Sequence, residues 1–301
     1  MRALSLTCLP GAASVDRYRG RHAAMTRSPT PEPMTPAAVA DSLAAVRARA
    51  PLVHSLTSAV VANFTANALL ALGCAAAMVE SLDEIAGFTA GADALVVNLG
   101  MLTPVRAQAM RLAADTAAAA GKPWVLDPVG AGAIAARTGF AAALCALRPS
   151  AIRGNASEIR GLAGYSGTGR GVDTGDVSDT AIAAAVQLAR QTGAVVTVSG
   201  AVDYITDGTA LAAVRNGHPM MTRVTGMGCA ATAIVGACLG AGIAPFVAVT
   251  HAMTLTAVAG EMAAGVASGP GSLGPGYLDA LYRLDAECLN RLARLQLQAG
   301  D

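Results

Sequence analysis

The sequence predicts an α/β fold in which helices cover both faces of a mostly parallel β-sheet. Short apolar runs with the length of strands alternate with longer helix-like segments along most of the 301 residues. Repeated strand–helix units are typical of parallel sheets covered on both sides. Hydrophobic residues make up 53% of the chain and charged residues only 14%, a balance that supplies a large core and excludes a disordered protein.

The first half of the predicted fold alternates short apolar strands with amphipathic or apolar helices. The helix that begins at Pro104 has proline in its first turn, where an N–H group has no helical partner to lose. In chain order we expect helix 37–49, strand 52–54, helix 58–72, strand 76–79, helix 82–89, strand 94–99, helix 104–120 and strand 124–127.

The second half continues the alternation and then becomes helical. We expect strand 151–153, helices 156–163 and 179–191, strands 195–199, 203–206 and 210–214, and three helices from Gly228 onward. No Asp, Glu, Lys or Arg lies between Arg223 and Glu261, which is compatible with a membrane span. Because small residues dominate and Ala-Gly-Ile-Ala-Pro marks a corner at residues 241–245, we predict two buried helices and no membrane contact.

Residues 1–34 differ from the rest of the chain in their many Arg and closely spaced Pro. The apolar stretch 3–9 is interrupted by Ser and Thr, which makes a poor signal peptide. We therefore expect a disordered N-terminal extension over residues 1–35, or a start of translation at Met25 or Met34, and one folded domain over residues 36–301.

A few residue counts exclude several functions. The formal net charge of +1 gives no general attraction to nucleic acid or to an acidic membrane. Lys122, the one lysine, precedes a proline, so a P-loop, which ends in Gly-Lys-Ser/Thr, is absent. The six cysteines form no C-x-x-C pair, which argues against a structural zinc site and is typical of a reduced, cytoplasmic protein.

The most specific local motif is Val-Thr-Gly-Met-Gly-Cys-Ala, residues 224–230, directly before an apolar helix. Successive N–H groups at a helix N-terminus bind phosphate or a developing oxyanion. Gly226 and Gly228 let a ligand approach the backbone, and the same position is expected to lower the pKa of the Cys229 thiol. The alternative is a glycine turn with a buried structural cysteine, and the sequence leaves both open.

Two further motifs follow predicted strands. Asp127 ends a strand and precedes Pro128 and a glycine-rich loop. An acid there suits Mg²⁺ or a phosphate-bound water, and the alternative is an Asp-Pro turn. Asn155 and Glu158 have the spacing of a helix capping box, but Arg153 just upstream is a natural partner for a phosphate oxygen.

A fourth motif lies at residues 51–67, where a strand runs through a polar turn into a helix. Asn63 and Asn67 lie on an otherwise apolar face of that helix. They are either buried and hydrogen-bonded within the fold or line a pocket, and the spacing does not decide between these alternatives.

Taken together, the motifs resemble the hydroxyethylthiazole kinase family of the ribokinase-like superfamily. The resemblance covers about residues 51–240 and continues more weakly to the C-terminus. It rests on four segments and their order: PLVHSLTSAVVANFTANALLALG, GKPWVLDPVGAGA, IRGNASEI and NGHPMMTRVTGMGC. It implies a ribokinase-like domain over residues 36–301 that phosphorylates the hydroxyl of 4-methyl-5-(2-hydroxyethyl)thiazole with MgATP, in thiamin salvage.

The resemblance also implies roles for individual residues. Cys229 matches the family's active-site cysteine, where most ribokinase-like enzymes place an aspartate base. The other matches are Arg153 and Ser199 for ATP, Met78 and Gly226 for the substrate, and Asp127 and Glu158 for Mg²⁺ and the phosphates. A homotrimer with thiazole sites at its subunit boundaries is implied as well.

Four positions depart from the family's pattern. Ser55 and Ser58 stand where the family commonly has Asn, and Met227 replaces a small residue in the glycine turn. Ser199 stands where the family usually has threonine, and it keeps the hydroxyl. The alternatives are a kinase for another small alcohol such as hydroxymethylpyrimidine, a non-catalytic binding paralogue, and a cysteine hydrolase. The last would need a histidine within hydrogen-bond reach of Cys229.

Overall fold

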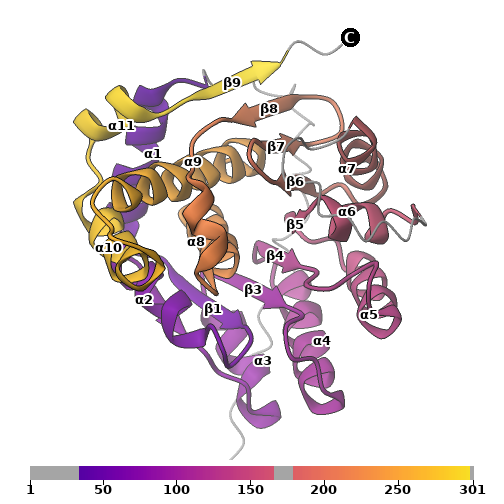
Figure 1. Cartoon of the computed structure of the whole chain (residues 1–301). Helices are drawn as coiled ribbons and strands as arrows, with labels where there is room; N and C mark the ends of the chain where they lie inside the picture. The colour runs from indigo at the N-terminus through magenta and orange to yellow at the C-terminus, as the bar shows by residue number, and fades with distance from the viewer. Residues whose placement is uncertain (1–33, 166–178, 299–301) are drawn as a thin grey trace, which may run out of the picture. The chain divides into compact units, whose positions relative to one another are not determined.

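The computed structural model describes residues 34–165 and 179–298, in which strands and helices alternate largely as the sequence predicts (Figure 1). The predicted N-terminal extension, residues 1–35, lies outside the described residues except for its last two. The extension and the domain boundary near residue 36 therefore remain predictions.

The described residues form a nine-stranded sheet in the order β2-β1-β3-β4-β5-β6-β7-β8-β9. The pairs from β2 to β6 are parallel, and those from β6 to β9 are antiparallel, so the predicted mostly parallel sheet is confirmed. The strands are β1 (Leu52–Leu56), β2 (Ala75–Ala77), β3 (Ala94–Asn98), β4 (Trp124–Asp127), β5 (Ala151–Asn155), β6 (Val195–Ser199), β7 (Asp203–Thr206), β8 (Leu211–Val214) and β9 (Leu295–Gln298).

Helices cover both faces because successive strand residues point to opposite sides of the sheet. Val96 and Val125 belong to one core cluster, and Leu95 and Leu126 belong to the other. The first cluster is covered by α1 (Pro36–Arg49), α2 (Ala62–Leu72), α8 (Met227–Gly240), α9 (Pro245–Ala264), α10 (Pro270–Arg283) and α11 (Ala286–Leu292). The second is covered by α3 (Leu82–Gly91), α4 (Pro104–Ala119), α5 (Ala135–Cys145), α6 (Ala156–Leu162) and α7 (Asp179–Thr192).

The strand order creates a switch point between β1 and β3. The chain leaves β1 through α2 to reach β2 on one side, and then passes through α3 to β3 on the other side. In such sheets ligands bind at the carboxyl ends of the strands near the switch point. We call this end of β1 to β6 the carboxyl edge; β3, β4 and β6 end there at Asn98, Asp127 and Ser199.

The charge-free stretch forms two helices, α8 and α9, joined at residues 241–244 as predicted. By length and composition α9 could cross a membrane, but 83% of its most apolar window is buried inside the fold. Its apolar surface is therefore that of a core helix.

Three predictions about elements were incomplete. Helix α5 was not predicted, because it is Ala-rich and only Ala141 and Leu144 of its residues are buried. Beyond Gly228 there are four helices rather than three, followed by β9, which pairs with β8. Helix α2 begins at Ala62 rather than at Ser58, since the N–H group of Val61 closes a turn onto the Ser58 carbonyl at 3.0 Å.

Candidate active site

Asp127, the last residue of β4, lies at the centre of a buried hydrogen-bond network. Its Oδ2 accepts hydrogen bonds from Asn98 Nδ2 at 2.7 Å and from Thr232 Oγ1 at 2.8 Å. Burial raises the pKa of Asp127 to about 6; the Arg153 guanidinium opposes this rise, and the Glu158 carboxylate adds to it. The network therefore joins β3, β4 and α8 around a carboxylate that is isolated from water.

Cys229, in the first turn of α8, joins this network through Asn98, whose Nδ2 donates to Cys229 Sγ at 3.3 Å. Burial, together with the charge of Asp127, raises the pKa of the thiol to about 12. The predicted lowering of this pKa by the helix N-terminus is therefore wrong. Loss of water and a neighbouring carboxylate outweigh the helix dipole, so the thiol is protonated at neutral pH.

Arg153 extends from β5 toward β6 and α8. Its Nη2 donates to Ser199 Oγ at 2.9 Å, and this hydroxyl donates in turn to the carbonyl of Gly154 at 3.2 Å. A Cβ atom at Gly228 would lie 2.6 Å from Arg153 Nη1, so glycine is required for the guanidinium to lie against the helix N-terminus. Arg153 Nε is buried without a hydrogen-bond partner among the described residues, which leaves this cation with unused donor capacity.

The glycine turn before α8 has the backbone that its sequence predicts. Gly226 is the N-cap residue with φ of 97°, in the left-handed region that favours glycine, and no side chain caps the helix. A Cβ atom there would lie 3.1 Å from Phe64 Cδ1, so the turn packs closely against α2. The first N–H groups of α8 thus lack a side-chain acceptor, as an anion-binding turn requires.

Glu158 forms the helix capping box that its spacing from Asn155 predicts, and it also contacts the loop that follows Asp127. Asn155 Oδ1 accepts from the Glu158 N–H at 3.0 Å and Glu158 Oε2 accepts from the Asn155 N–H at 2.9 Å, which completes the capping box of α6. The second oxygen, Oε1, accepts from the N–H of Gly130 at 3.0 Å. Glu158 therefore ties the loop after Asp127 to the start of α6.

The substrate-side candidates lie farther along the edge. Met78 directly follows β2 and is half-buried, and β1 and β3 separate β2 from β4 and Asp127. The structure thus brings Asp127, Arg153 and Ser199 together with the glycine turn, but it does not place Met78 beside them. The two asparagines of the fourth motif bond to each other, with Asn67 Nδ2 donating to Asn63 Oδ1 at 3.1 Å near the surface.

Comparison with known proteins decides which family uses this arrangement. The sequence model of the hydroxyethylthiazole kinase family matches residues 43–287. The chain belongs to the hydroxyethylthiazole kinase family. The predicted family and the predicted ribokinase-like fold are both confirmed.

Relatives in this family are similar over most of their length. The hydroxyethylthiazole kinase of Granulibacter bethesdensis is 54% identical over 252 residues, 84% of this chain and 92% of its own. That of Cronobacter sakazakii is 55% identical over 237 residues, 79% and 89% of the two chains. The hydroxyethylthiazole kinase structure from Pyrococcus horikoshii superposes with a TM-score of 0.81 at 37% identity, covering 87% and 99%. A pyridoxal kinase from Staphylococcus aureus shares the fold, with a TM-score of 0.58 at 16% identity over 82% and 97%.

The histidines of this hydroxyethylthiazole kinase family member do not support the cysteine hydrolase alternative. His54 pairs with the Val79 carbonyl at 2.8 Å, and His251 pairs with Ser42 Oγ at 2.7 Å. His218 accepts from the N–H of Met220 at 3.2 Å. Each of these three described histidines is engaged away from Cys229, whose hydrogen-bond partner is an amide.

Two residues of the site, Asn98 and Thr232, were missed by sequence reasoning. Asn98 is the last residue of the apolar strand β3, as Asp127 is of β4. A polar residue at the end of an apolar strand could therefore have predicted that Asn98 belongs to the site. Thr232 lies three residues after Cys229, on the same side of α8, but an apolar helix of small residues gave no reason to single out its hydroxyl.

The departures from the hydroxyethylthiazole kinase pattern are accommodated without charge changes. Met227 is 5% exposed and belongs to the core cluster on the side of α8 and α9. Ser55 is fully buried and its hydroxyl has no hydrogen-bond partner among the described residues. Ser58 is also buried and lies against Gly100, where a Cβ atom would come within 2.9 Å of the serine Cβ.

Proposed function

We propose that this protein transfers the γ-phosphoryl group of ATP to the hydroxyl of 4-methyl-5-(2-hydroxyethyl)thiazole, a reaction of thiamin salvage. The observation that carries the proposal is the meeting of Arg153, the glycine turn and buried Asp127 at one edge of the sheet. Phosphoryl transfer needs mainly positioning and charge neutralisation, which these groups supply. Membership of the family selects the thiazole alcohol as acceptor.

Arg153 and Ser199 bind the ATP phosphates in this proposal. The guanidinium keeps a buried Nε–H without a partner among the described residues and donates to the Ser199 hydroxyl at 2.9 Å, which supports binding of one anion by these two neighbouring side chains. The N–H groups of Gly228 and Cys229 at the start of α8 donate hydrogen bonds to the oxygens of the transferred phosphoryl group, on which negative charge develops. Fixed donors in a site with little water stabilise such charge strongly.

Asp127 and Glu158 fit a magnesium ion that is held mainly by phosphates and water. Both hydrogen bonds that the Asp127 carboxylate accepts within the described residues go to Oδ2, which leaves Oδ1 for the ion or its water. Glu158 uses each oxygen for one backbone N–H group and would act through water. No cluster of three His, Cys, Asp or Glu occurs in the described residues; Mg²⁺ is usually bound through one or two carboxylates together with substrate phosphates and water. The ion supplies charge neutralisation at the phosphates.

Cys229 orients the acceptor hydroxyl and gives modest base help at most. A thiol with a pKa of about 12 is almost fully protonated at neutral pH. The hydroxyl proton therefore leaves late, and the transferred phosphoryl group itself can accept it. In this proposal Cys229 lies next to the reacting oxygen as a neutral thiol, and its role does not require a thiolate.

Met78 and Gly226 contact the thiazole in this proposal, as the resemblance implies. Gly226 packs on Phe64 and Val61 of the β1–α2 region, which places an apolar wall beside the glycine turn. Ser55 and Ser58 lie along the same region, so they affect how the acceptor is held rather than the phosphates.

The protein is proposed to act as a cytoplasmic homotrimer whose kinase domain spans residues 36–301. Light scattering at micromolar concentration measures the assembly, and a monomer would contradict it. A variant that begins at Met34 tests the domain boundary, because loss of folding or activity would assign residues 1–33 to the working domain. Neither test depends on the identity of the acceptor.

The experiment that tests the function is ADP release with MgATP and one of three additions: the thiazole alcohol, hydroxymethylpyrimidine or no acceptor. We expect turnover with the thiazole alcohol to exceed that with the pyrimidine alcohol by about 100-fold in kcat/KM, since the two rings place their polar groups differently. Preference for the pyrimidine would reassign the substrate. ATP binding without turnover on either alcohol would make the protein a non-catalytic paralogue.

A further inference from the structure

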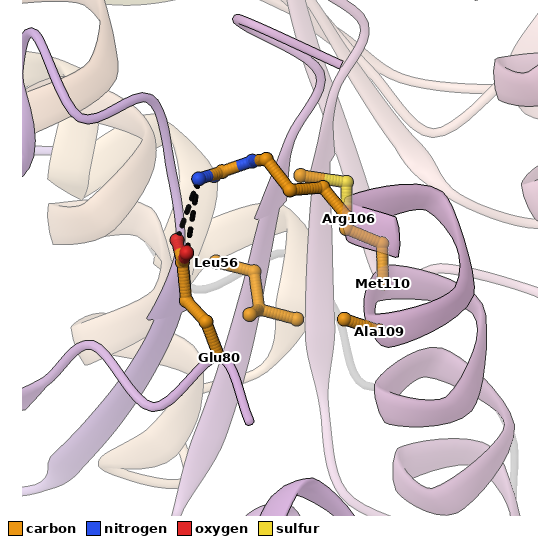
Figure 2. A pocket seen from close by; sticks show the side chains of 5 residues that line it. All are labelled: Leu56, Glu80, Arg106, Ala109 and Met110. Carbon is orange, nitrogen blue, oxygen red and sulfur yellow. Dashed lines mark hydrogen bonds and ion pairs between the residues drawn. The ribbon is translucent and has the colours of Figure 1, made fainter. Parts of the chain in front are cut away.

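The Arg106 side chain, in the first turn of α4, contacts two loops at the carboxyl edge. Figure 2 shows its contact with one of them, at Glu80. Its Nη1 donates to Glu80 Oε2 at 3.0 Å and lies 2.8 Å from Oε1 in an ion pair, and its Nη2 donates to the carbonyl oxygen of Thr57. The side chain is only 17% exposed. A small cavity beside it has an apolar lining of Leu56, Ala109 and Met110.

The segment that carries Glu80 also carries Met78. His54, inside β1, pairs with the Val79 carbonyl at 2.8 Å, and Arg106 holds Glu80 one residue later. Residues 78–80 are therefore fixed at two successive positions after β2 ends. These two contacts therefore also fix the backbone position of Met78.

The segment that carries Thr57 leads to the glycine turn. Thr57 follows the last residue of β1, and residues 58–61 form the turn into α2, closed by Val61 N–H to the Ser58 carbonyl. Val61 lies next to Gly226, where a Cβ atom would come within 3.3 Å of Val61 Cβ. Arg106 thus fixes the far end of a short segment whose near end packs against the phosphate-binding turn.

The arrangement suits positioning better than stability. A guanidinium removed from water loses hydration that a single carboxylate rarely restores in full, and Arg106 Nε is buried without a hydrogen-bond partner among the described residues. The planar fork of arginine instead fixes the direction of two partners at once. The contact with the Thr57 carbonyl is partly buried, whereas the Glu80 side chain is 43% exposed and its contact with Arg106 is open to solvent.

We propose that Arg106 is a positioning residue for the alcohol acceptor, holding residues 78–80 and the 57–61 turn in register on the two sides of the acceptor's place. The inference rests on the proposed function, because it takes Met78 and Gly226 as acceptor contacts. Among the described residues the polar contacts of Arg106 go to Glu80 and Thr57 and not to the groups around Asp127, so we expect its effect to fall on the acceptor.

The test compares four variants of the full chain by steady-state kinetics with MgATP and the thiazole alcohol. Arg106→Ala removes both contacts, Arg106→Lys keeps the charge without the fork, and Glu80→Gln weakens one contact but leaves that to Thr57. Arg111→Ala is the matched control, since Arg111 lies on the same helix and, within residues 34–165 and 179–298, pairs only with Asp115 at the surface, each side chain being 47% exposed. Binding of the thiazole alcohol by calorimetry gives a second readout that does not depend on turnover.

We expect Arg106→Ala to raise the acceptor KM and Kd by about 10- to 100-fold, as misplacement of a binding wall by about 1 Å does, with the ATP KM within twofold of wild type. Arg106→Lys and Glu80→Gln should show intermediate increases, and Arg111→Ala none. If Arg106→Ala does not fold, the two milder variants decide. Unchanged acceptor KM and Kd in them, or equal losses toward ATP and acceptor, would overturn the positioning role. An inactive wild type would instead remove the proposed function, and this inference with it.

Discussion

Replacing Asp127 by asparagine should stabilise the folded protein at neutral pH while abolishing most of its activity. The carboxylate is 2% exposed, and its pKa rises from 3.8 to about 6 on folding because burial disfavours the charge. At about 1.4 kcal/mol per pH unit, holding this group ionised in the folded state costs about 3 kcal/mol at pH 7.5. Asparagine has nearly the same shape and can still accept from Asn98 and Thr232 through its carbonyl oxygen.

The sign of the pH dependence follows from proton binding. Between pH 3.8 and about 6 the folded state binds more protons at Asp127 than the unfolded state does, so wild-type stability falls as the pH rises through this window. The advantage of Asp127→Asn over wild type should therefore grow with pH, from about 1.5 kcal/mol at pH 5 to about 3 kcal/mol at pH 7.5. Above pH 7.5 it should change no further.

Urea unfolding at pH 5 and pH 7.5, without ATP or metal, measures both values. Asp115→Asn is the control, because that acid is at the surface beside Arg111 and should change stability by less than about 1 kcal/mol at either pH. Kinase activity of Asp127→Asn should fall by at least about 100-fold, since the phosphates lose an acidic metal site. A destabilised Asp127→Asn, or a stability difference that is the same at both pH values, would refute the reasoning.

Other variants probe the remaining parts of the site. Cys229→Ser should retain measurable activity, and Cys229→Asp should keep or raise it, because base help is worth about 10²–10⁴-fold at most; steady-state rates check both, and complete loss in Cys229→Ser with ATP binding intact would make the thiol essential. Arg153→Ala should cost more turnover than Cys229→Ser, since a cation near several phosphate charges is lost. Gly228→Ala should raise the ATP KM, as its Cβ would lie 2.6 Å from Arg153 Nη1, and an unchanged KM would contradict that contact. Asn98→Ala should lower stability by about 1–3 kcal/mol, measured by urea unfolding, because Asp127 loses a buried donor.

The family and the features that meet around Asp127 could be predicted from the sequence because their signals are local. Asp127 ends an apolar strand, the glycine turn directly precedes an apolar helix, and Arg153 lies within a short strand. Each of these features occupies a few consecutive residues, so its chemistry is visible without knowing what packs against it. Strand–helix alternation likewise follows from residue spacing along the chain.

Other features of the site could be found only in the tertiary structure, because they depend on contacts between residues that are distant in sequence. The Asp127 network needs Asn98 from β3 and Thr232 from α8, and the Arg106 contacts join residues that follow β1 and β2 to α4. Strand β9 exists because β8 offers it an edge to pair with. The pKa of Cys229 rises instead of falling because packing removes water and brings a carboxylate near. Desolvation and long-range pairing depend on how helices and strands pack against each other, so they cannot be predicted from the spacing of residues along the chain.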